Sequence, residues 1–353
     1  MRFISGDTLR HFFMDVLAYH GVREEVREHV AEGLVQTSVR GVDSHGAQLF
    51  PHYIAALKGG RINGNPKLTL TRHTPGAALL DADHTFGHAA GAFAMQNAIA
   101  MAKGVGVACV AVANSSHCAA AAYYALMAAE SDMIGMFFTH ATPHMLYPGA
   151  KSSTLGPNPI CFTAPMEGEE PFCLDMSTTV VTFNRLKVAH KAGGTAEPGW
   201  GTDEDGAPST DPRRITHLFP IGGYKGYGLG MMIDILCGLL SGMPVGPDVS
   251  RMYTNPVSEK RRLGHFCMVI DIATFEDVSV FKRRLSDYCK RLREQAMVDP
   301  TARAKVPGDP EKEMKARRLR EGIPIPDGLW QDLLGLGEEA GVLGIRLDEV
   351  PNR

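Results

Sequence analysis

The sequence predicts a mixed α/β fold, in which helices flank a sheet and a helical outer domain is built from both ends of the chain. From about residue 68 onward, short apolar segments typical of β-strands alternate with Ala-rich helical segments. Helical patterns instead occupy residues 7–57 and the segment after residue 298. We therefore expect an outer domain of residues 1–72 and 298–353 beside a core of residues 73–297.

The two chain ends supply the expected outer helices. Apolar residues recur at helical spacing over residues 7–19 and 24–37, and Gly21 separates the two segments. A third helix is expected through Tyr53 and Leu57. Near the other end, a charged helix follows the PGDPE motif, and a last helix near residues 328–339 is expected to return to the opening ones.

The middle of the chain supplies the expected sheet. The strands are the short apolar runs LTLT, AALLDA, VACVAVA, MIGMFF and FCMVIDI. Ala-rich helices are expected around residues 88–103 and 119–130, and residues 203–212 (DEDGAPSTDP) are typical of an exposed loop. This mixture of short strands and helices is what defines the predicted fold class.

Composition limits the classes of function. The chain has 353 residues, 44% hydrophobic and 21% charged, with a formal net charge of -3. This balance predicts a globular protein without the basic surface that nucleic acids require. The seven cysteines form no CxxC pair, and no apolar run reaches the roughly 18 residues of a membrane span. We expect a cytoplasmic protein that binds neither membranes nor nucleic acid.

A lysine stands among glycines and tyrosines in GGYKGYGLG, at the start of an apolar helix. After Tyr227 the apolar residues recur at helical spacing, so Lys225 is expected just before a buried helix. Helix N-termini attract anions, and glycines let a ligand approach the backbone. The segment therefore predicts an anion site at Lys225; the alternative is a Gly-rich turn with a solvated lysine.

Several common motifs are missing. The sequence contains no GxxxxGK[ST] loop, no HExxH, no GxSxG, and no GxGxxG between a strand and a helix, so a Rossmann fold is not expected. His84 and His88 are spaced to share a helix face, but no carboxylate accompanies them, so we expect no metal site there.

Two histidines lie in polar loops at the ends of elements. His45 is part of GVDSHGAQ, between helices, and His117 is part of NSSHCAAA, between a strand and an Ala-rich helix. A loop histidine with a near-neutral pKa can serve as a general acid or base, whereas the alternative for each is a hydrogen-bonded capping residue. The loops GPNP, DMSTT and GYKGYG also adjoin strands, and together these loops predict a cleft.

The motifs DSHGAQLFPHY, VANSSH, LGPNP, LDMSTT, GYKGYGLGMMIDIL and PGDPE occur in one order along the chain. In order and spacing the chain resembles the type 2 malate/L-lactate dehydrogenase family, which includes ureidoglycolate dehydrogenase, sulfolactate dehydrogenase and cyclic-imine reductases. The resemblance covers nearly the whole chain. It implies an NAD(P)-dependent oxidoreductase with a nucleotide-binding sheet that is not a Rossmann fold, a small carboxylate substrate and a homodimer.

The resemblance also implies residue roles. His117 matches the catalytic proton acceptor, with His45 as a second catalytic candidate. Substrate contacts are implied for Ser44, His45, Leu49, Tyr53 and Arg185. Contacts with NAD or NADP are implied for His140, Ala141, Asp175, Met176, Ser177, Lys225, Pro307, Gly308 and Asp309.

The sequence departs from the family at three places. Relatives usually carry arginine where Leu49 stands, glycine where Ala119 stands, and Gly-Lys where Asn184 and Arg185 stand. Leu49 lies one helical turn from His45, so we expect it beside the substrate. A leucine offers no guanidinium, which should weaken malate, lactate and ureidoglycolate unless another cation, with Arg185 the nearest by motif, replaces it. The alternative is that Leu49 only packs between helices.

Three functions are consistent with these residues. The first is hydride transfer between a nicotinamide cofactor and a small 2-hydroxy, 2-oxo or ureido acid. The second is NAD(P)H-dependent reduction of a cyclic imine. The third, from a different class, is cofactor binding without turnover, as expected of a paralogue whose site positions have diverged.

Overall fold

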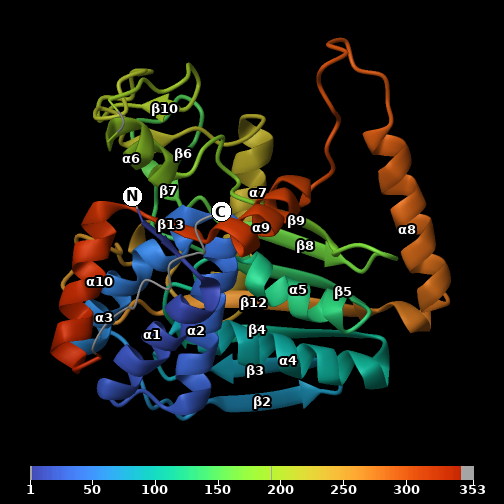
Figure 1. Cartoon of the computed structure of the whole chain (residues 1–353), viewed down its shortest axis with the longest axis horizontal. Helices are drawn as coiled ribbons and strands as arrows, with labels where there is room; N and C mark the ends of the chain where they lie inside the picture. Colours follow the sequence, from blue (N-terminus) through green and yellow to red (C-terminus); the bar gives the residue numbers. More distant parts are fainter. Residues whose placement is uncertain (1, 192, 343–353) are drawn as a thin grey trace.

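The computed structural model describes residues 2–191 and 193–342, and these form the mixed α/β fold that the sequence predicts (Figure 1). A large sheet crosses the molecule, helices from the beginning and end of the chain lie at one end of it, and a small lobe stands above it. No helix in the described ranges has the length and hydrophobicity that crossing a bilayer requires.

The central sheet has seven strands in the order β2-β3-β4-β12-β5-β8-β9. Only β3 and β4 run parallel, and every other neighbouring pair is antiparallel. A Rossmann sheet is mostly parallel, so this sheet is of a different kind. The strands are β2 (Thr69–Thr74), β3 (Ala77–Asp81), β4 (Val107–Ser115), β5 (Met133–Thr139), β8 (Ile160–Ala164), β9 (Phe172–Met176) and β12 (Leu263–Asp271).

Two Ala-rich helices, α4 (Gly87–Val105) and α5 (Ala122–Glu130), pack on the sheet. Small residues allow a close approach: a Cβ on Gly135 of β5 would lie 2.5 Å from the carbonyl oxygen of Ala125 in α5. The helix backbone therefore rests almost directly on the strand. Both helices match segments that the sequence predicted, although α5 begins three residues later than expected because Ala119 has a left-handed backbone.

The opening and closing segments share a second hydrophobic core, separate from that of the sheet. A short two-stranded sheet joins the ends of the chain, with Arg2 paired to Ile325. The elements are β1 (Arg2–Ile4), α1 (Gly6–Tyr19), α2 (Glu24–Val39), α3 (Phe50–Lys58), α9 (Asp309–Glu321), β13 (Ile323–Ile325) and α10 (Asp327–Ala340). The domain boundaries stay a prediction, and residues 343–353 of the expected outer domain lie outside the described residues.

A small lobe and a protruding helix were not foreseen. The lobe holds a four-stranded sheet in the order β10-β11-β6-β7, helix α6 (Phe183–Lys191) and its own core around Trp200. It includes the expected loop 203–212, which is largely exposed. The protruding helix is α8 (Val278–Arg293), seen on the right of Figure 1. The lobe strands are β6 (Met145–Leu146), β7 (Ser153–Leu155), β10 (Gly201–Thr202) and β11 (His217–Leu218).

The helix after GGYKGYG differs from the prediction. Helix α7 (Tyr224–Asp234) begins before Lys225, so the lysine lies in its first turn, and a π-helical turn, Ile235–Leu239, continues it. We expected a buried helix, but Leu229 is 37% and Leu240 58% exposed, while Ile233 is buried. The expectation is wrong for the single chain, because only one edge of this helix meets the sheet.

Candidate active site

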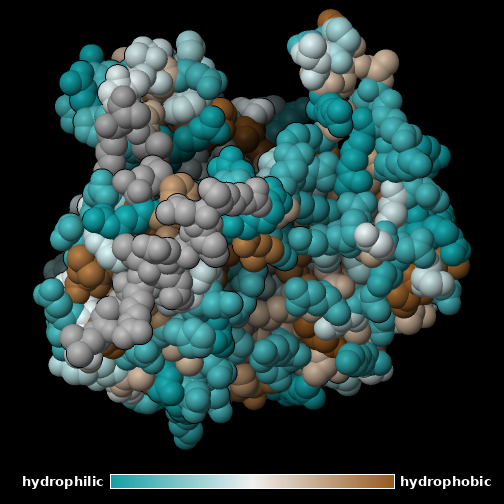
Figure 2. Space-filling view, in the orientation of Figure 1, coloured by the Kyte–Doolittle hydropathy of each residue, from teal (hydrophilic) through white to brown (hydrophobic). Residues whose placement is uncertain are grey.

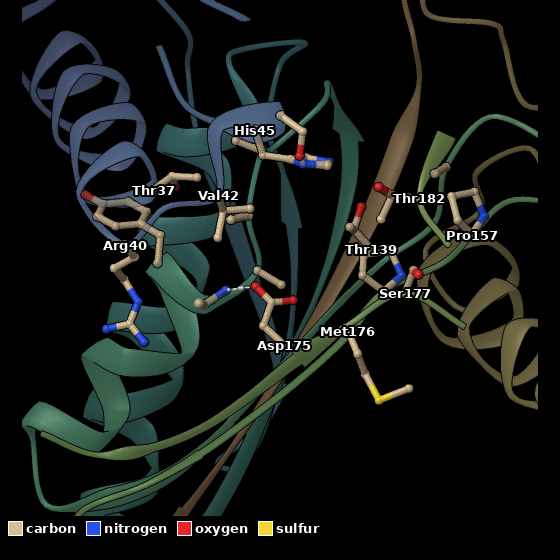
Figure 3. Close-up of a pocket in the computed structure, with 18 of the residues that line it drawn as sticks. Thr37, Arg40, Val42, His45, Thr139, Pro157, Asp175, Met176, Ser177 and Thr182 are labelled. Atoms are coloured by element: carbon tan, nitrogen blue, oxygen red, sulfur yellow. Dashed lines mark hydrogen bonds between the residues drawn. The ribbon is translucent and has the colours of Figure 1, made fainter. Parts of the chain in front are cut away.

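One cavity of 1580 Å³ lies between the N-terminal helices, the ends of the central strands and the small lobe. Figure 2 also shows a hollow between the lobe and the arm formed by α8, although no residue of α8 lines this cavity. In Figure 3, His45 enters from the N-terminal segments, while Thr139, Asp175 and Ser177 come from the strands opposite. The cavity is lined by most of the predicted site residues: Ser44, His45, Leu49, His117, His140, Ala141, Asp175, Met176, Ser177, Arg185, Pro307 and Gly308.

His117 and Tyr53 form a hydrogen-bonded pair at this cavity. His117 follows β4, and its Nδ1 lies 2.7 Å from the Tyr53 hydroxyl. Tyr53 is 1% exposed on the inner face of α3 and lies behind His117, outside the residues that line the cavity. It therefore touches the imidazole, whereas we had expected it to touch the substrate.

Burial sets the protonation of the pair. It lowers the pKa of His117 well below 6.5, and the neighbouring His45 and Arg261 lower it further. Burial also raises the pKa of Tyr53 well above 10. At neutral pH both groups are uncharged. The Ala119 amide donates to Nδ1 at 3.4 Å in the tautomer whose Nε2 carries the hydrogen. In the other tautomer Nδ1–H donates to the Tyr53 oxygen and Nε2 is the free acceptor, which is the form that a general base requires.

His45 lies against His117 as a second neutral imidazole. The two rings are 5.9 Å apart between centroids and inclined by 25°. The Ser44 hydroxyl lies 2.8 Å from His45 Nδ1, and burial lowers the pKa of His45 to about 4. An imidazole held in this way can hydrogen-bond a substrate oxygen without adding charge.

Leu49 and Arg185 line the cavity from different elements. Leu49 is 5% exposed and adds apolar surface beside His45. Arg185 belongs to α6 in the lobe, where its guanidinium lies 5.5 Å from the centre of the Trp200 ring. Arg185 therefore stacks on an aromatic face, and its role as a substitute for a guanidinium at position 49 stays a prediction.

The predicted cofactor residues Asp175, Met176 and Ser177 lie where β9 ends. Asp175 Oδ2 accepts a hydrogen bond of 2.8 Å from the amide of Ala122 at the start of α5, drawn as a dashed line in Figure 3. The carboxylate has access to the cavity, yet protein surrounds it on its other sides, and this burial raises its pKa to about 6. Such a carboxylate can accept hydrogen bonds from ligand hydroxyls.

The other predicted cofactor residues divide into two groups. Ala141, Pro307 and Gly308 line the cavity. His140 also lines it, but its imidazole is 1% exposed and its Nε2 accepts a hydrogen bond from the Gly264 amide. Asp309 lies outside the lining residues, because its carboxylate is bound by Arg293 at 2.8 and 2.9 Å.

Lys225 also lies outside this cavity. Its side chain is exposed on the first turn of α7, whereas Ile221, four residues earlier, lines the cavity wall. The structure thus places the lysine near the rim but not on the wall, and its contact with a cofactor stays a prediction.

Three lining arginines were not foreseen from the sequence, namely Arg40, Arg251 and Arg261, and two of them are buried. Arg40 precedes DSHG by three residues; it is 7% exposed, its Nη1 binds Glu170, and its Nη2 has no partner. Arg261 precedes β12 and is 3% exposed. A signal was available for Arg40, which adjoins the DSHG motif, whereas Arg261 lies in the charged run EKRR at residues 259–262.

The cavity suits a dinucleotide together with a small substrate. Its volume exceeds the roughly 300–1,000 Å³ typical of a site for one small molecule. The unpartnered Nη2 of Arg40 offers a donor for a phosphate, and the carboxylate of Asp175 offers an acceptor for hydroxyls. No group of three or more metal-binding side chains occurs within residues 2–191 and 193–342.

Comparisons with known proteins agree with this site. Residues 4–334 match the family model described as malate/L-lactate dehydrogenase. The chain is 35% identical to malate dehydrogenase of Pyrococcus abyssi, covering 98% of this chain and 96% of the relative. It is 34% identical to ureidoglycolate dehydrogenase (NAD(+)) of Escherichia coli O157:H7, with coverage of 94% and 95%. Malate dehydrogenase of Entamoeba histolytica superposes with a TM-score of 0.92 at 29% identity, covering 96% and 98%.

These matches define the class of protein as a dehydrogenase. The chain belongs to the malate/L-lactate dehydrogenase family, as the motifs in its sequence indicated.

The backbone of Ala119 is strained. Ala119 has φ of 57°, in the left-handed region that costs a non-glycine residue roughly 1–2 kcal/mol. Ala119→Gly removes this strain but adds freedom to the unfolded chain, worth roughly 0.4–1 kcal/mol. We expect a net stabilisation of about 0.5–1 kcal/mol, measured by chemical denaturation.

Ala120→Gly provides the matched control, because Ala120 is also buried but has no positive φ. It should destabilise the protein. Equal destabilisation by both variants would contradict the assignment of strain to Ala119.

Proposed function

We propose that this protein transfers hydride between a nicotinamide cofactor, NAD or NADP, and a small 2-hydroxy or 2-oxo acid, ureido acids included. The proposal is carried by the buried His117–Tyr53 pair, which places a neutral imidazole on a cavity of 1580 Å³. The names of the relatives, malate dehydrogenase and ureidoglycolate dehydrogenase (NAD(+)), support the substrate class and the cofactor.

His117 carries out the proton transfer. When bound, the cofactor supplies the hydride acceptor for the substrate carbon. His117 Nε2 takes the proton from the substrate hydroxyl, while Tyr53 holds the ring through Nδ1. Because its pKa is low, the imidazole is neutral and able to accept that proton at physiological pH.

The cofactor is held by groups from both sides of the cavity. Arg40 offers its unpartnered Nη2 to a phosphate, and Asp175 offers its carboxylate to a hydroxyl. Ser177 and Gly308 contribute wall surface beside them. A charged nucleotide thus meets one cation and several hydrogen-bonding groups, which is the combination that such ligands require.

We further propose a cytoplasmic homodimer formed through α7. Met231, Ile235 and Leu239 recur every four residues on one face and are 49%, 51% and 61% exposed. Figure 2 shows hydrophobic surface between the lobe and the arm, where α7 lies in Figure 1. A contiguous exposed apolar face of this kind is typical of a subunit contact, and a two-fold dimer buries it on both copies. The seven unbonded cysteines fit a reducing compartment.

A substrate panel tests the function. We expect 2-hydroxy acids with NAD⁺ or NADP⁺ to give a rise in absorbance at the wavelength of the reduced cofactor. Cyclic imines with NADH or NADPH should give no comparable turnover. Turnover of imines alone would overturn the proposed substrate class, and cofactor binding without any turnover would overturn the proposed activity.

His117→Asn tests the catalytic role. The variant should reduce kcat by about 10²-fold or more, since general-base catalysis contributes roughly 10²–10⁴-fold. Its affinity for NADH should stay near that of the parent, as measured by fluorescence titration. Tyr53→Phe is the companion variant and should give a smaller loss. If His117→Asn keeps a kcat near that of the parent, His45 becomes the candidate for the general base.

Leu239→Lys tests the dimer. A buried unpaired lysine at a subunit contact is unfavourable, so the mass measured by light scattering should fall from that of a dimer toward that of a monomer. Leu319→Lys is the control, because Leu319 is 67% exposed on α9. A dimer that survives in Leu239→Lys would place the contact elsewhere.

A further inference from the structure

Arg261 is a buried cation on the cavity wall with an incomplete set of partners. Its Nε donates to the Ser250 hydroxyl at 2.9 Å, and its Nη2 donates to the Thr142 hydroxyl at 3.1 Å. Its Nη1 is buried and has no hydrogen-bond partner. Within the described residues, no carboxylate lies within salt-bridge distance of this guanidinium, so two neutral hydroxyls are its polar contacts.

The other buried arginines of the described chain are compensated. Arg61 donates to four backbone carbonyls at 2.8–3.0 Å. Arg318 binds both carboxylate oxygens of Asp43, and Arg40 binds Glu170. These arginines have structural partners, whereas Arg261 keeps its charge on the wall of the cavity without an anion.

The charge on Arg261 persists at neutral pH. Burial lowers its pKa to about 10, which still leaves the guanidinium protonated. A buried charge without a counter-ion costs several kcal/mol in general, and a fold that keeps one at a ligand cavity gains when an anion binds there. The arrangement is therefore suited to a carboxylate, which a guanidinium binds with charge-assisted hydrogen bonds.

Arg261 also lies at the reacting end of the cavity. Leu263 of β12 pairs with Ser115 of β4 in antiparallel register. Arg261 precedes this pair by two residues and His117 follows it by two, so both leave the sheet at the same end. The positive charge of Arg261 is one of the causes that lower the pKa of His117. An anion on Arg261 is thus near the imidazole that takes the proton.

We propose that Arg261 binds the carboxylate of the substrate, in place of the guanidinium that relatives carry at position 49. This inference rests on the proposed dehydrogenase function and narrows it. With the carboxylate on Arg261, Leu49 presents apolar surface to the remainder of the substrate. The favoured substrates are therefore 2-hydroxy monocarboxylic acids with an apolar side chain rather than dicarboxylic acids.

Arg261→Met and Arg261→Lys test the carboxylate site in the full-length protein. For the best hydroxy acid of the panel, Arg261→Met should raise KM about ten- to a hundredfold, and Arg261→Lys should recover part of the loss. NADH affinity should stay unchanged in both. Arg262→Met is the matched control, because Arg262 is the next residue but is exposed and lies outside the residues that line the cavity, so KM should change less than about threefold.

The pH profile separates binding from a structural role. Removing a positive charge near His117 favours its protonated form, so its pKa in the free enzyme should rise. The acidic limb of the kcat/KM profile should move to higher pH in Arg261→Met and stay in place in Arg262→Met. Cooperative thermal unfolding of each variant shows that it is folded. If folded Arg261→Met keeps both the KM and the acidic limb of the kcat/KM profile of the parent, the proposal is wrong.

Oxamate, an unreactive analogue of a 2-oxo acid, gives a readout without turnover. It should raise the thermal unfolding temperature of the NADH-bound parent, and Arg261→Met should lose this shift while Arg262→Met keeps it. Should the parent turn over no hydroxy acid but bind oxamate through Arg261, the anion site stands and the proposed activity fails. If oxamate still raises the unfolding temperature of Arg261→Met, the carboxylate site at Arg261 is wrong, whereas the proposed activity is unaffected.

Leu49→Arg tests the specificity. The ratio of kcat/KM for 2-hydroxyisocaproate to that for malate should exceed one in the parent and fall at least about tenfold in the variant, because the new guanidinium can bind a second carboxylate. If the parent prefers malate, the proposed contact between Leu49 and the apolar end of the substrate is wrong.

Discussion

The position of β12 between β4 and β5 is the constraint on which the site depends. This strand comes more than 120 residues later in the chain than its two neighbours, yet it pairs with both along nearly its full length. The pairing brings the segment before β12, with Arg261, to the same sheet end as the loop after β4, with His117. The helices of the N-terminal segment then cover that end and supply Tyr53 and His45. Groups of the candidate site from three distant parts of the sequence thus meet because one strand is inserted centrally.

Burial gives these groups their chemistry. A cluster of imidazoles, including His45, His117 and His140, is held neutral because desolvation lowers each pKa. The protein therefore presents bases without positive charge, while the buried Arg261 keeps a charged guanidinium at the same sheet end. An anionic substrate is attracted by that charge while the imidazoles stay able to accept a proton. The positive charge thus lies on a guanidinium and the proton acceptor is a neutral imidazole. This arrangement suits oxidation of a hydroxyl beside a carboxylate.

The sequence predicted the helices of the outer domain but missed α8 and the lobe. The expected helix at residues 7–19 became α1 (Gly6–Tyr19), because five apolar residues of that helix are buried on one face. Helix α8 was missed although its sequence carried a signal, since Val278, Phe281, Leu285, Cys289 and Leu292 recur at helical spacing. The lobe strands have two or three residues each, too few for an alternating pattern. The cavity residues near DSHG and VANSSH could be foreseen from motifs, whereas Arg261 lies in a charged run whose burial depends on long-range pairing.

The glycines before Lys225 allow a turn of the chain, apart from any contact with a ligand. Gly222 and Gly223 have φ of 57° and 66°, conformations that a side chain at either position would disfavour. They turn the chain between Ile221, on the cavity wall, and α7, whose apolar face points outward. The same turn places Lys225 at the rim, between the cavity and the proposed dimer contact. Packing within one chain does not account for the exposed apolar residues, because only Ile233 and a few small or polar residues of α7 are buried. The exposed apolar residues of this helix are therefore better explained by a second copy than by the stability of the single chain.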